Sequence, residues 1–481
     1  MLHLMGRLNM KYRIVLFGAG RFLDNIIDDE CIKDSECLCI CDNNPDIWNQ
    51  DKYGLTIYNL SILKEYRYDF VVISNSHAHE IKKQLQEAGV LEECIKTYEE
   101  YVGICSKGRP LEYRSDEYNP CRVNYDGEYV LLITTYLSFA GGSWAAVYAL
   151  MALVDAGYKV KLVTPGGDIR FVEVLNEFGV DVYVYPNVMF ESIKEMPWLG
   201  NPSHVIVNTY QMHHCICNLK FDKKLIWWLH EAPVYYVDNI RMYGKCREEE
   251  LSNSVIYGVS KYAEESFHQF YENIETEILE YGIPDERLQY KDNYAKSNSK
   301  KMIFGLVGTI CQRKGHDLFA DAIIDLTDEL RERCEFWIIG GIGDKDFYEK
   351  VTEKCLSYNN IVFFPEMGHD ELMRRYRDMD VLVCPSRQDP LPIVVTEAMM
   401  LGVPCILSDA VGTMRYVSDD DVICFYNENV RDLKEKIEFV IHNRNILDGY
   451  GKNVRKVYEN MFSIQSFKDR LIDGLRKSDS K

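Results

Sequence analysis

Short runs of apolar residues alternate with amphipathic segments along almost the whole chain. Strand-like runs include "YRIVLFGAG" at 12–20, "EYVLLITTY" at 128–136 and "MIFGLVGTI" at 302–310. Between such runs, apolar residues recur at helical spacing, as in the segment 143–157. Short buried strands joined by crossover helices are typical of parallel sheets. The pattern therefore predicts an α/β protein whose elements fall into three successive stretches.

Two polar segments without a regular period separate these three stretches. Residues 105–127 contain proline and glycine between charged residues, and a second polar segment covers 290–301. We predict a small α/β domain over residues 10–104, a linker over 105–127, a second domain over 128–295, and a third domain over 296–481 that ends in terminal helices.

Net charge and cysteine usage limit the partners and the compartment. The formal net charge is −20, which argues against a nucleic-acid partner, because phosphates attract clusters of Lys and Arg. It argues more weakly against contact with an anionic membrane surface. No run of about 18 apolar residues predicts a membrane span, and no secretory pattern precedes the 16 cysteines. We predict free thiols and a cytoplasmic location, with peripheral contact at the inner face of the membrane left open.

Residues with metal-binding chemistry are present, but their spacing does not favour a metal site. Cys37, Cys39 and Cys41 alternate along a predicted strand, where small buried apolar side chains fit better. The run "HHCICN" at 213–218 has no second ligand pair at the spacing that zinc sites use. The run "DMD" at 378–380 leads directly into a predicted strand. We therefore predict no metal site.

A basic pair follows a glycine turn at the start of the third domain. In "VGTICQRKGHDLF" at 307–319, Arg313 and Lys314 stand between a predicted strand and a predicted helix. Backbone N–H groups near a helix N-terminus attract anions, and adjacent cations add to this attraction. An exposed basic pair without a ligand is the alternative.

Two carboxylates lie on either side of a predicted helix start in "PSRQDPLPIVVTEAMMLGVPCI" at 385–406. Asp389 precedes the helix, and Glu397 lies inside it. Pro392 suits the first helical turn, which leaves the N–H groups of Ile393 and Val394 available. A diphosphate at the helix start, with a pair of sugar hydroxyls on each side, would satisfy all of these groups together.

Residues 128 to about 475 resemble glycosyltransferase family 4, which consists of retaining enzymes with the GT-B fold. The matching stretches occur in the family's order: "AGGSWAAVYALMALVDAGYKVKLVTP", "LIWWLHEAP", "YGVSKYAEESF", "ILEYGIP", "LVGTICQRKG", "FWIIGG" and "VCPSRQDPLPIVVTEAMMLGVPCI". The resemblance implies two Rossmann-like domains that face a cleft, with the nucleotide-sugar held mostly by the C-terminal one.

The resemblance also implies roles for residues of the third domain. Asp389 and Glu397 match the two ends of the family's Glu-x7-Glu, of which the first acid contacts the donor sugar and the second contacts the ribose. Lys314 matches the phosphate-binding lysine. The family often has an arginine where this chain has Thr309, so we expect Arg313 to substitute for it.

Three further positions are carried over with alternatives open. Gly141 and Gly142 match the glycine loop that lets the backbone approach the donor, although a plain helix start would explain them as well. His230 matches a histidine near the transferred sugar, and a structural histidine at a strand end is the alternative. Glu366 lies in a loop that is often near the base, or it is only a solvated acid.

The first domain carries a weak dinucleotide-binding pattern. Gly18 and Gly20 form a glycine turn after a strand, and Asp42 follows about 20 residues later. The third glycine of the fingerprint is replaced by Leu23. The domain resembles Rossmann-like modules attached to sugar-modifying enzymes, some of which bind a nucleotide or coenzyme A. A nucleotide site, a partner-docking or oligomerisation role, and a dehydrogenase all remain open.

We expect a retaining, hexosyltransferase-type enzyme that uses a nucleotide-diphosphate sugar and requires no cofactor or metal. The expected acceptor is a glycan, a lipid-linked sugar or a protein, in the biosynthesis of surface polysaccharide or glycoconjugate. The alternative is a catalytically weak nucleotide-sugar-binding protein whose first domain recruits a partner.

Overall fold

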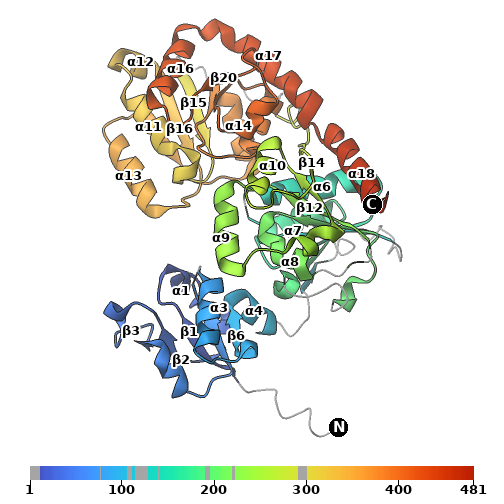
Figure 1. Cartoon of the computed structure of the whole chain (residues 1–481). Coiled ribbons are helices and arrows are strands. Elements are labelled where there is room, and N and C mark those ends of the chain that lie inside the picture. Colours follow the sequence, from blue (N-terminus) through green and yellow to red (C-terminus); the bar gives the residue numbers. More distant parts are fainter. Residues whose placement is uncertain are drawn as a thin grey trace.

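The chain is described by a computed structural model that covers residues 11–75, 77–105, 111–113, 128–138, 140–189, 196–218, 221, 223–290 and 301–480. Its strands form three sheets, each flanked by helices (Figure 1). Nearly all strand pairs are parallel, and the exceptions are β3 with β4 and β7 with β10. The predicted α/β class is confirmed.

The N-terminal sheet has the strand order β3-β4-β2-β1-β5-β6. Its strands are β1 (Arg13–Phe17), β2 (Glu36–Cys41), β3 (Asp51–Lys52), β4 (Leu55–Tyr58), β5 (Phe70–Ile73) and β6 (Ile95–Thr97). Its helices are α1 (Arg21–Ile26), α2 (Glu30–Lys33), α3 (Ala78–Glu87) and α4 (Tyr98–Cys105). Strand β1 is central and almost entirely buried, which explains its unbroken apolar run.

The middle sheet has the strand order β14-β13-β12-β11-β8-β9-β10-β7. Its strands are β7 (Leu111–Tyr113), β8 (Val130–Ile133), β9 (Val160–Thr164), β10 (Asp181–Val184), β11 (His204–Asn208), β12 (Leu225–Leu229), β13 (Ser254–Gly258) and β14 (Thr276–Ile278). Its helices are α6 (Gly141–Asp155), α7 (Ile169–Glu177), α8 (His213–Asn218), α9 (Pro233–Tyr243) and α10 (Lys261–His268), with a short 3-10 turn η4 at Pro186–Met189.

The C-terminal sheet has the strand order β17-β16-β15-β18-β19-β20. Its strands are β15 (Met302–Val307), β16 (Cys334–Ile339), β17 (Ile361–Phe364), β18 (Val381–Cys384), β19 (Cys405–Ser408) and β20 (Ile423–Phe425). The helices that follow in the chain are α11 (His316–Ile324), α12 (Asp328–Glu332), α13 (Lys345–Cys355), α14 (His369–Asp378), α15 (Ile393–Leu401), α16 (Val430–His442), α17 (Leu447–Val457) and α18 (Ile464–Ser480).

The chain crosses between the middle and C-terminal parts twice. After α17, the last helix α18 returns to the middle sheet and packs on α6 and β12 (Figure 1). This packing explains why α6 is apolar and buried on nearly every face, since α18 covers the face that would otherwise meet water. The terminal helices thus tie two predicted domains together.

Part of the predicted linker belongs to the middle sheet. Leu111–Tyr113 forms β7, which pairs antiparallel with β10. Cys105, the first residue of the predicted linker, is the last residue of α4. Residues 106–110 and 114–127 lie outside the described residues, as do residues 291–300 of the second polar segment. The domain boundaries themselves stay a prediction.

The N-terminal domain packs on the middle domain through two helices. Helix α3 contacts α9, and α4 contacts the turn η4. An exposed ion pair reaches further, from Arg21 at the start of α1 to Asp346 on α13, 3.2 Å away. The first domain therefore contacts both of the other two.

The cysteines differ from the expectation of free thiols at one place. Cys217 on α8 and Cys246 after α9 form a disulfide, whereas the other described cysteines are free. The residues are 29 positions apart, and only the packing of α8 against the segment after α9 brings them together. Among the described residues, no helix is both long and apolar enough to cross a membrane.

Candidate functional site

A cavity of about 590 Å³ lies between the middle and C-terminal parts. It is formed at the carboxyl ends of strands in both sheets, which is where ligands bind in open α/β sheets. Every site residue predicted outside the first domain lines it, namely Gly141, Gly142, His230, Thr309, Arg313, Lys314, Glu366, Asp389, Ile393, Val394 and Glu397. The packing thus gathers residues up to 256 positions apart in the sequence, from Gly141 to Glu397.

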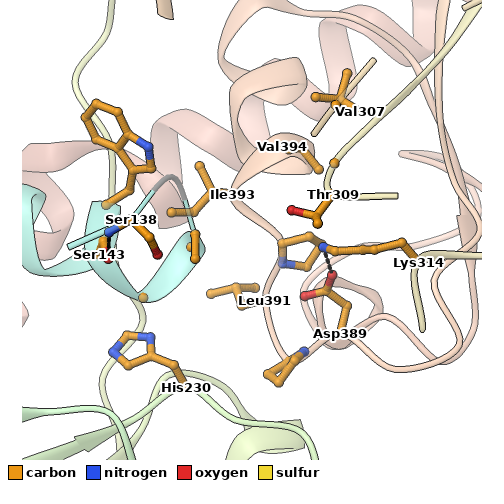
Figure 2. Close-up of a pocket in the computed structure, with 18 of the residues that line it drawn as sticks. Ser138, Ser143, His230, Val307, Thr309, Lys314, Asp389, Leu391, Ile393 and Val394 are labelled. Carbon is orange, nitrogen blue, oxygen red and sulfur yellow. Dashed lines mark hydrogen bonds and ion pairs between the residues drawn. The ribbon is translucent and has the colours of Figure 1, made fainter. Parts of the chain in front are cut away.

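Lys314 and Asp389 form an ion pair inside the cavity (Figure 2). The Lys314 Nζ donates to Asp389 Oδ2 over 2.5 Å. Arg313 Nη1 lies 3.6 Å from the same oxygen and donates to the carbonyl of Gln388 over 2.7 Å. The Arg313 guanidinium also lies over the ring of Tyr235, 5.7 Å from its centroid. Two cations and one nearly buried carboxylate therefore share one wall of the cavity.

Gly315 allows the basic pair to approach the loop that carries Asp389. It adopts φ +73°, and a Cβ there would lie 2.0 Å from the carbonyl oxygen of Pro385. The two cations lie on a single 3-10 turn, Gln312–Lys314, that directly precedes α11. The predicted helix start is correct, with the basic pair one turn outside the helix.

Helix α15 begins at Ile393, and Pro392 is its N-cap. The sequence predicted Pro392 inside the first turn, so the proline lies one position outside the helix. The N–H groups of Ile393 and Val394 lie in the first turn, where they have no acceptor within the helix. The preceding loop is held by the middle part. Ser260 Oγ donates to the carbonyl of Pro390, and Tyr281 Oη donates to that of Leu391.

Glu397 lies deeper in the cavity wall and is 6% exposed. Its Oε2 accepts a hydrogen bond of 3.0 Å from the Tyr376 hydroxyl. Burial raises the pKa of Glu397 to about 7, against the lowering effects of the His369 charge and the Tyr376 hydroxyl. This carboxyl therefore changes protonation near neutral pH.

The opposite wall comes from the start of α6. Gly142 has its carbonyl bonded by Asn208 Nδ2 over 3.0 Å, and a Cβ at Gly142 would lie 3.2 Å from Thr209. A Cβ at Gly141 would meet Ile393 Cδ1 at 3.9 Å. The glycine turn therefore lies directly across the cavity from the first turn of α15, where a bulky side chain would narrow the gap.

His230 follows β12 and points into the cavity from the middle part (Figure 2). Burial lowers its pKa to about 3, so the imidazole is neutral at pH 7. Its Nε2 is buried and has no hydrogen-bond partner among the described residues. A neutral ring with an unused nitrogen is suited to a hydroxyl group of a ligand.

Glu231, which the sequence analysis did not single out, holds His230 in place. Its Oε2 accepts from the backbone N–H of His230, and its Oε1 accepts from that of Tyr210, each over 2.8 Å. Burial raises the pKa of Glu231 to about 7. The side chain lines the cavity and joins the ends of two neighbouring strands, β11 and β12. Its position directly after His230 in "LHEAP" was the available signal.

Two further lining residues were also missed. Tyr235 supplies the ring beside Arg313, and His369 lies 5.7 Å from the Trp144 ring across the cavity. His369 Nε2 bonds Glu286 Oε2 over 2.6 Å. These contacts join elements that are distant in the sequence, so neither residue stands out from spacing alone.

Thr309 and Glu366 lie where their strands predict. Thr309 follows β15, close to Lys314 in the close-up (Figure 2). Glu366 follows β17 and is exposed, and its carboxyl carbon would lie 3.6 Å from a Cβ on Gly341. The charge of Glu366 acts on the guanidinium of Arg170, whose pKa it helps to raise.

The predicted residues of the first domain brace their own turn. Gly18 has φ +117° and donates its N–H to the carbonyl of Cys41. Asp42 Oδ2 accepts from the N–H of Ala19, and its Oδ1 accepts from that of Asn44, each over 2.8 Å. Lys52 Nζ donates to the carbonyl of Ala19. Gly20 is the N-cap of α1. The carboxylate of Asp42 therefore holds the backbone of the turn that leads into this helix.

Cys217, in the run at 213–218 for which the sequence shows no second ligand pair, lies beside two further residues with metal-binding chemistry. Within the described residues, the cluster that could hold a cation is Cys217, Cys246 and Glu250. The two sulfurs form the disulfide, and Glu250 bonds the backbone and guanidinium of Arg247. In the "DMD" run, Asp380 bonds the N–H of Ile303 and pairs with Arg444.

Comparison with known families identifies two parts of the chain. Residues 290–457 match the family model described as glycosyl transferases group 1. Residues 10–96 match the model described as C2185-like, N-terminal.

Several similar curated proteins are named as glycosyltransferases. An uncharacterized glycosyltransferase of Methanocaldococcus jannaschii is 22% identical over 350 residues, which cover 64% of this chain and 87% of the relative. The lipopolysaccharide glucosyltransferase WaaG of Escherichia coli is 26% identical over 28% of this chain and 36% of its own length. The capsular polysaccharide biosynthesis glycosyltransferase CapM of Staphylococcus aureus is 26% identical over 40% of this chain and 51% of its own length.

Solved structures share the fold of the last two domains. HepE of Anabaena, in complex with UDP and glucose, superposes with a TM-score of 0.61 at 14% identity, covering 73% of this chain and 100% of HepE. A glycosyltransferase from Rickettsia africae gives a TM-score of 0.60 at 14% identity, over 74% of this chain and 99% of its own. The predicted GT-B fold is confirmed, and residues 290–457 form a domain of the glycosyl transferases group 1 family, with a further α/β domain at the N-terminal end of the described residues.

Proposed function

We propose that the protein is a retaining glycosyltransferase that moves a hexose from a nucleotide-diphosphate sugar to an acceptor. The observation that carries this proposal is the grouping of Lys314, Arg313 and the first turn of α15 in one cavity with the buried Glu397. The cations and the N–H groups suit a diphosphate. A buried carboxylate suits a pair of hydroxyls, such as those of ribose.

The charges also suit the reaction. Breaking the bond between the sugar and the phosphate builds positive charge at the anomeric carbon and negative charge on the leaving diphosphate. Lys314, Arg313 and the N-terminal end of α15 would stabilise that anion as it forms. These groups supply the positive charge that a divalent cation supplies elsewhere, and we propose that no metal ion is required.

The middle part would hold the sugar and the acceptor. The neutral His230 would bond a sugar hydroxyl with its unused nitrogen, and Glu231 would keep that ring in place. Gly141 and Gly142 would let the backbone come close to the diphosphate. Retention of the anomeric configuration is proposed from the family resemblance.

The acceptor is proposed from the relatives. The names of WaaG and CapM place those proteins in the synthesis of lipopolysaccharide and of capsular polysaccharide. We propose a glycan or lipid-linked acceptor in surface polysaccharide or glycoconjugate biosynthesis, with the reaction on the cytoplasmic side.

A thermal-unfolding screen with nucleoside diphosphates and their sugars tests the donor class. A ligand present at 100 times its dissociation constant should stabilise the protein by ~2.7 kcal/mol. The matching donor should then be hydrolysed slowly without acceptor, with a rate that EDTA leaves unchanged. Stabilisation by a nucleotide-sugar without any hydrolysis would favour a binding protein, and no stabilisation by any of these ligands would contradict the proposal.

A further inference from the structure

We propose that a second cavity, in the C-terminal domain, binds a phosphate-bearing anion. This cavity has a volume of about 850 Å³ and lies among α14, α15 and α17. Its lining includes Met379 and Asp380, which directly precede β18, and Val403 and Pro404, which directly precede β19. It therefore lies at the amino ends of the strands, on the opposite edge of the sheet from the donor cavity.

The lining is strongly basic, although the chain as a whole is acidic. Its basic side chains are Arg287, Arg377, Arg444, Lys452, Arg455 and Lys456, and its acidic side chains are Asp380, Asp448 and Glu459. The excess is three positive charges in a chain of net charge −20. Clustered cations around a concave surface focus the potential and concentrate anions there.

Two of the cations are already neutralised by the protein. Arg444 lies 3.3 Å from Asp380. Arg455 pairs with Asp285 and Glu459 and donates to the carbonyl of Met400. These two side chains hold the walls of the cavity together.

The remaining four cations are available to a ligand. Within the part of the chain that the structure describes, Arg287, Arg377, Lys452 and Lys456 form no ion pair with a carboxylate. Arg377 is partly buried and the other three are exposed. They come from three separate segments: the loop after β14, the end of α14, and α17. Unpaired cations that converge from different elements are suited to one anion with several acceptor oxygens.

The charges and the volume of the cavity favour a phosphorylated compound over a single small inorganic anion. Arginine forks match phosphate oxygens in pairs, and lysines add point charges at the rim. A volume of about 850 Å³ exceeds what one phosphate fills and leaves room for the group attached to it. A soluble phosphorylated compound and a phospholipid headgroup share this chemistry.

Helix α15 lines both the basic cavity and the donor cavity. Ile393, at the start of α15, lines the donor cavity, and Leu401, at its end, lines the basic cavity. A ligand in the basic cavity would contact the element that carries Glu397.

Calorimetric titration of the full chain with inorganic pyrophosphate tests the proposal. Pyrophosphate should also bind the donor cavity, so the titration is made with Lys314→Ala, which removes a donor-site cation. In that background Arg287→Ala with Lys452→Ala should weaken the remaining binding by roughly fivefold or more, as expected for two exposed charge contacts. The matched control adds Arg431→Ala and Lys350→Ala, which remove one exposed arginine on α16 and one exposed lysine on α13 in the same domain, and should change binding less than about twofold.

A second arm distinguishes the two sources of the phosphate. Vesicles of phosphatidylcholine with phosphatidylglycerol are sedimented with each variant, at low salt and at 0.15 M salt, where charges are screened over about 8 Å. Binding of pyrophosphate alone supports a soluble ligand, and binding of vesicles that the Arg287 and Lys452 substitutions abolish supports a headgroup. Equal responses of the cavity variant and the control variant to both probes would overturn the proposal. The result is separate from the donor-site proposal, on which only the effect of Lys314→Ala bears.

Discussion

The Nζ of Lys314 lies 2.5 Å from Oδ2 of Asp389, so the two side chains expected to hold different parts of the donor neutralise each other. Both are largely withdrawn from water, with side-chain exposures of 16% and 7%. A diphosphate would have to replace the carboxylate as the partner of Lys314. Asp389 would then be free to turn towards the sugar. Lys314 and Asp389 would thus bind each other in the empty cavity, and different parts of the donor once it is bound.

Lys314→Ala should weaken the binding of a nucleoside diphosphate and of the corresponding donor alike. Loss of one hydrogen bond to a charged group costs ~1.5–3 kcal/mol, or roughly 10- to 150-fold in affinity. Calorimetry with the free diphosphate measures the change. Lys354→Ala is the control, because Lys354 pairs with Asp321 on the surface, 2.7 Å away, outside the cavity. Unchanged affinity in Lys314→Ala would contradict the phosphate assignment.

Asp389→Asn should act on the reaction and spare the binding of free nucleoside diphosphate. The amide removes the charge that holds Lys314, so the diphosphate meets less competition. The sugar loses a charged partner that orients it as the anomeric bond breaks, so kcat should fall. Steady-state kinetics and diphosphate titrations together measure both effects. Weaker diphosphate binding in this variant would contradict a role of Asp389 that is confined to the sugar.

Glu397→Gln, unlike Asp389→Asn, should weaken the binding of the donor and of free nucleoside diphosphate. A carboxylate that holds the ribose contributes in the ground state and in the transition state, so its loss mainly raises the donor KM. Affinity for the free nucleoside diphosphate should fall by roughly 10- to 150-fold, from the loss of ~1.5–3 kcal/mol. If Glu397→Gln leaves diphosphate binding intact and Asp389→Asn abolishes it, the two roles are reversed.

The stability of the protein should depend on the ionisation of Glu397. Burial raises the pKa of Glu397 from its usual 4.5 to about 7, so between these pH values the folded state holds more protons than the unfolded state. The free energy of unfolding should therefore fall as pH rises through this range, by ~3 kcal/mol at most for this group. Above about pH 7 the fall should level off.

Urea unfolding at pH 5 and at pH 8 measures this dependence. Glu397→Gln should reduce the difference between the two pH values, whereas Glu353→Gln, at an exposed position on α13, should leave it unchanged. Glu231 contributes in the same direction, since burial also raises its pKa to about 7, so part of the difference should persist. An unchanged difference in Glu397→Gln would show that the carboxyl is not held in its buried environment.

Truncation should reveal what the residues before the middle sheet contribute. A chain that begins at residue 106 keeps β7, which pairs with β10, and a chain that begins at 126 loses this edge strand. The shorter chain should unfold at a lower temperature, because β10 loses its antiparallel partner. Both chains also expose the face of α9 that α3 covers. Equal melting temperatures for the two chains would contradict a structural role for β7.

The sequence was sufficient for features encoded locally. The alternation of strands and helices predicts all three sheets, and motif order predicts which loops meet in the donor cavity. It was insufficient where a contact depends on tertiary packing. Nothing near Cys217 points to Cys246, and Leu111–Tyr113 is too short to show a strand period. Asp42 shows that a matching motif does not fix a role. Its spacing from the glycine turn fits a ribose ligand, whereas its two oxygens accept from the N–H groups of Ala19 and Asn44.

The two passages of the chain between the middle and C-terminal domains are joined to each other. Ile283, on the first passage, donates its N–H to the carbonyl of Phe462 and accepts from the N–H of Ile464 on the second. These two hydrogen bonds fix the crossing point, so any rotation of one domain against the other would turn about it. Displacement grows with distance from a pivot. The surface contact between Arg21 and Asp346, which joins the N-terminal domain to α13, is the kind of link that such a rotation would make and break.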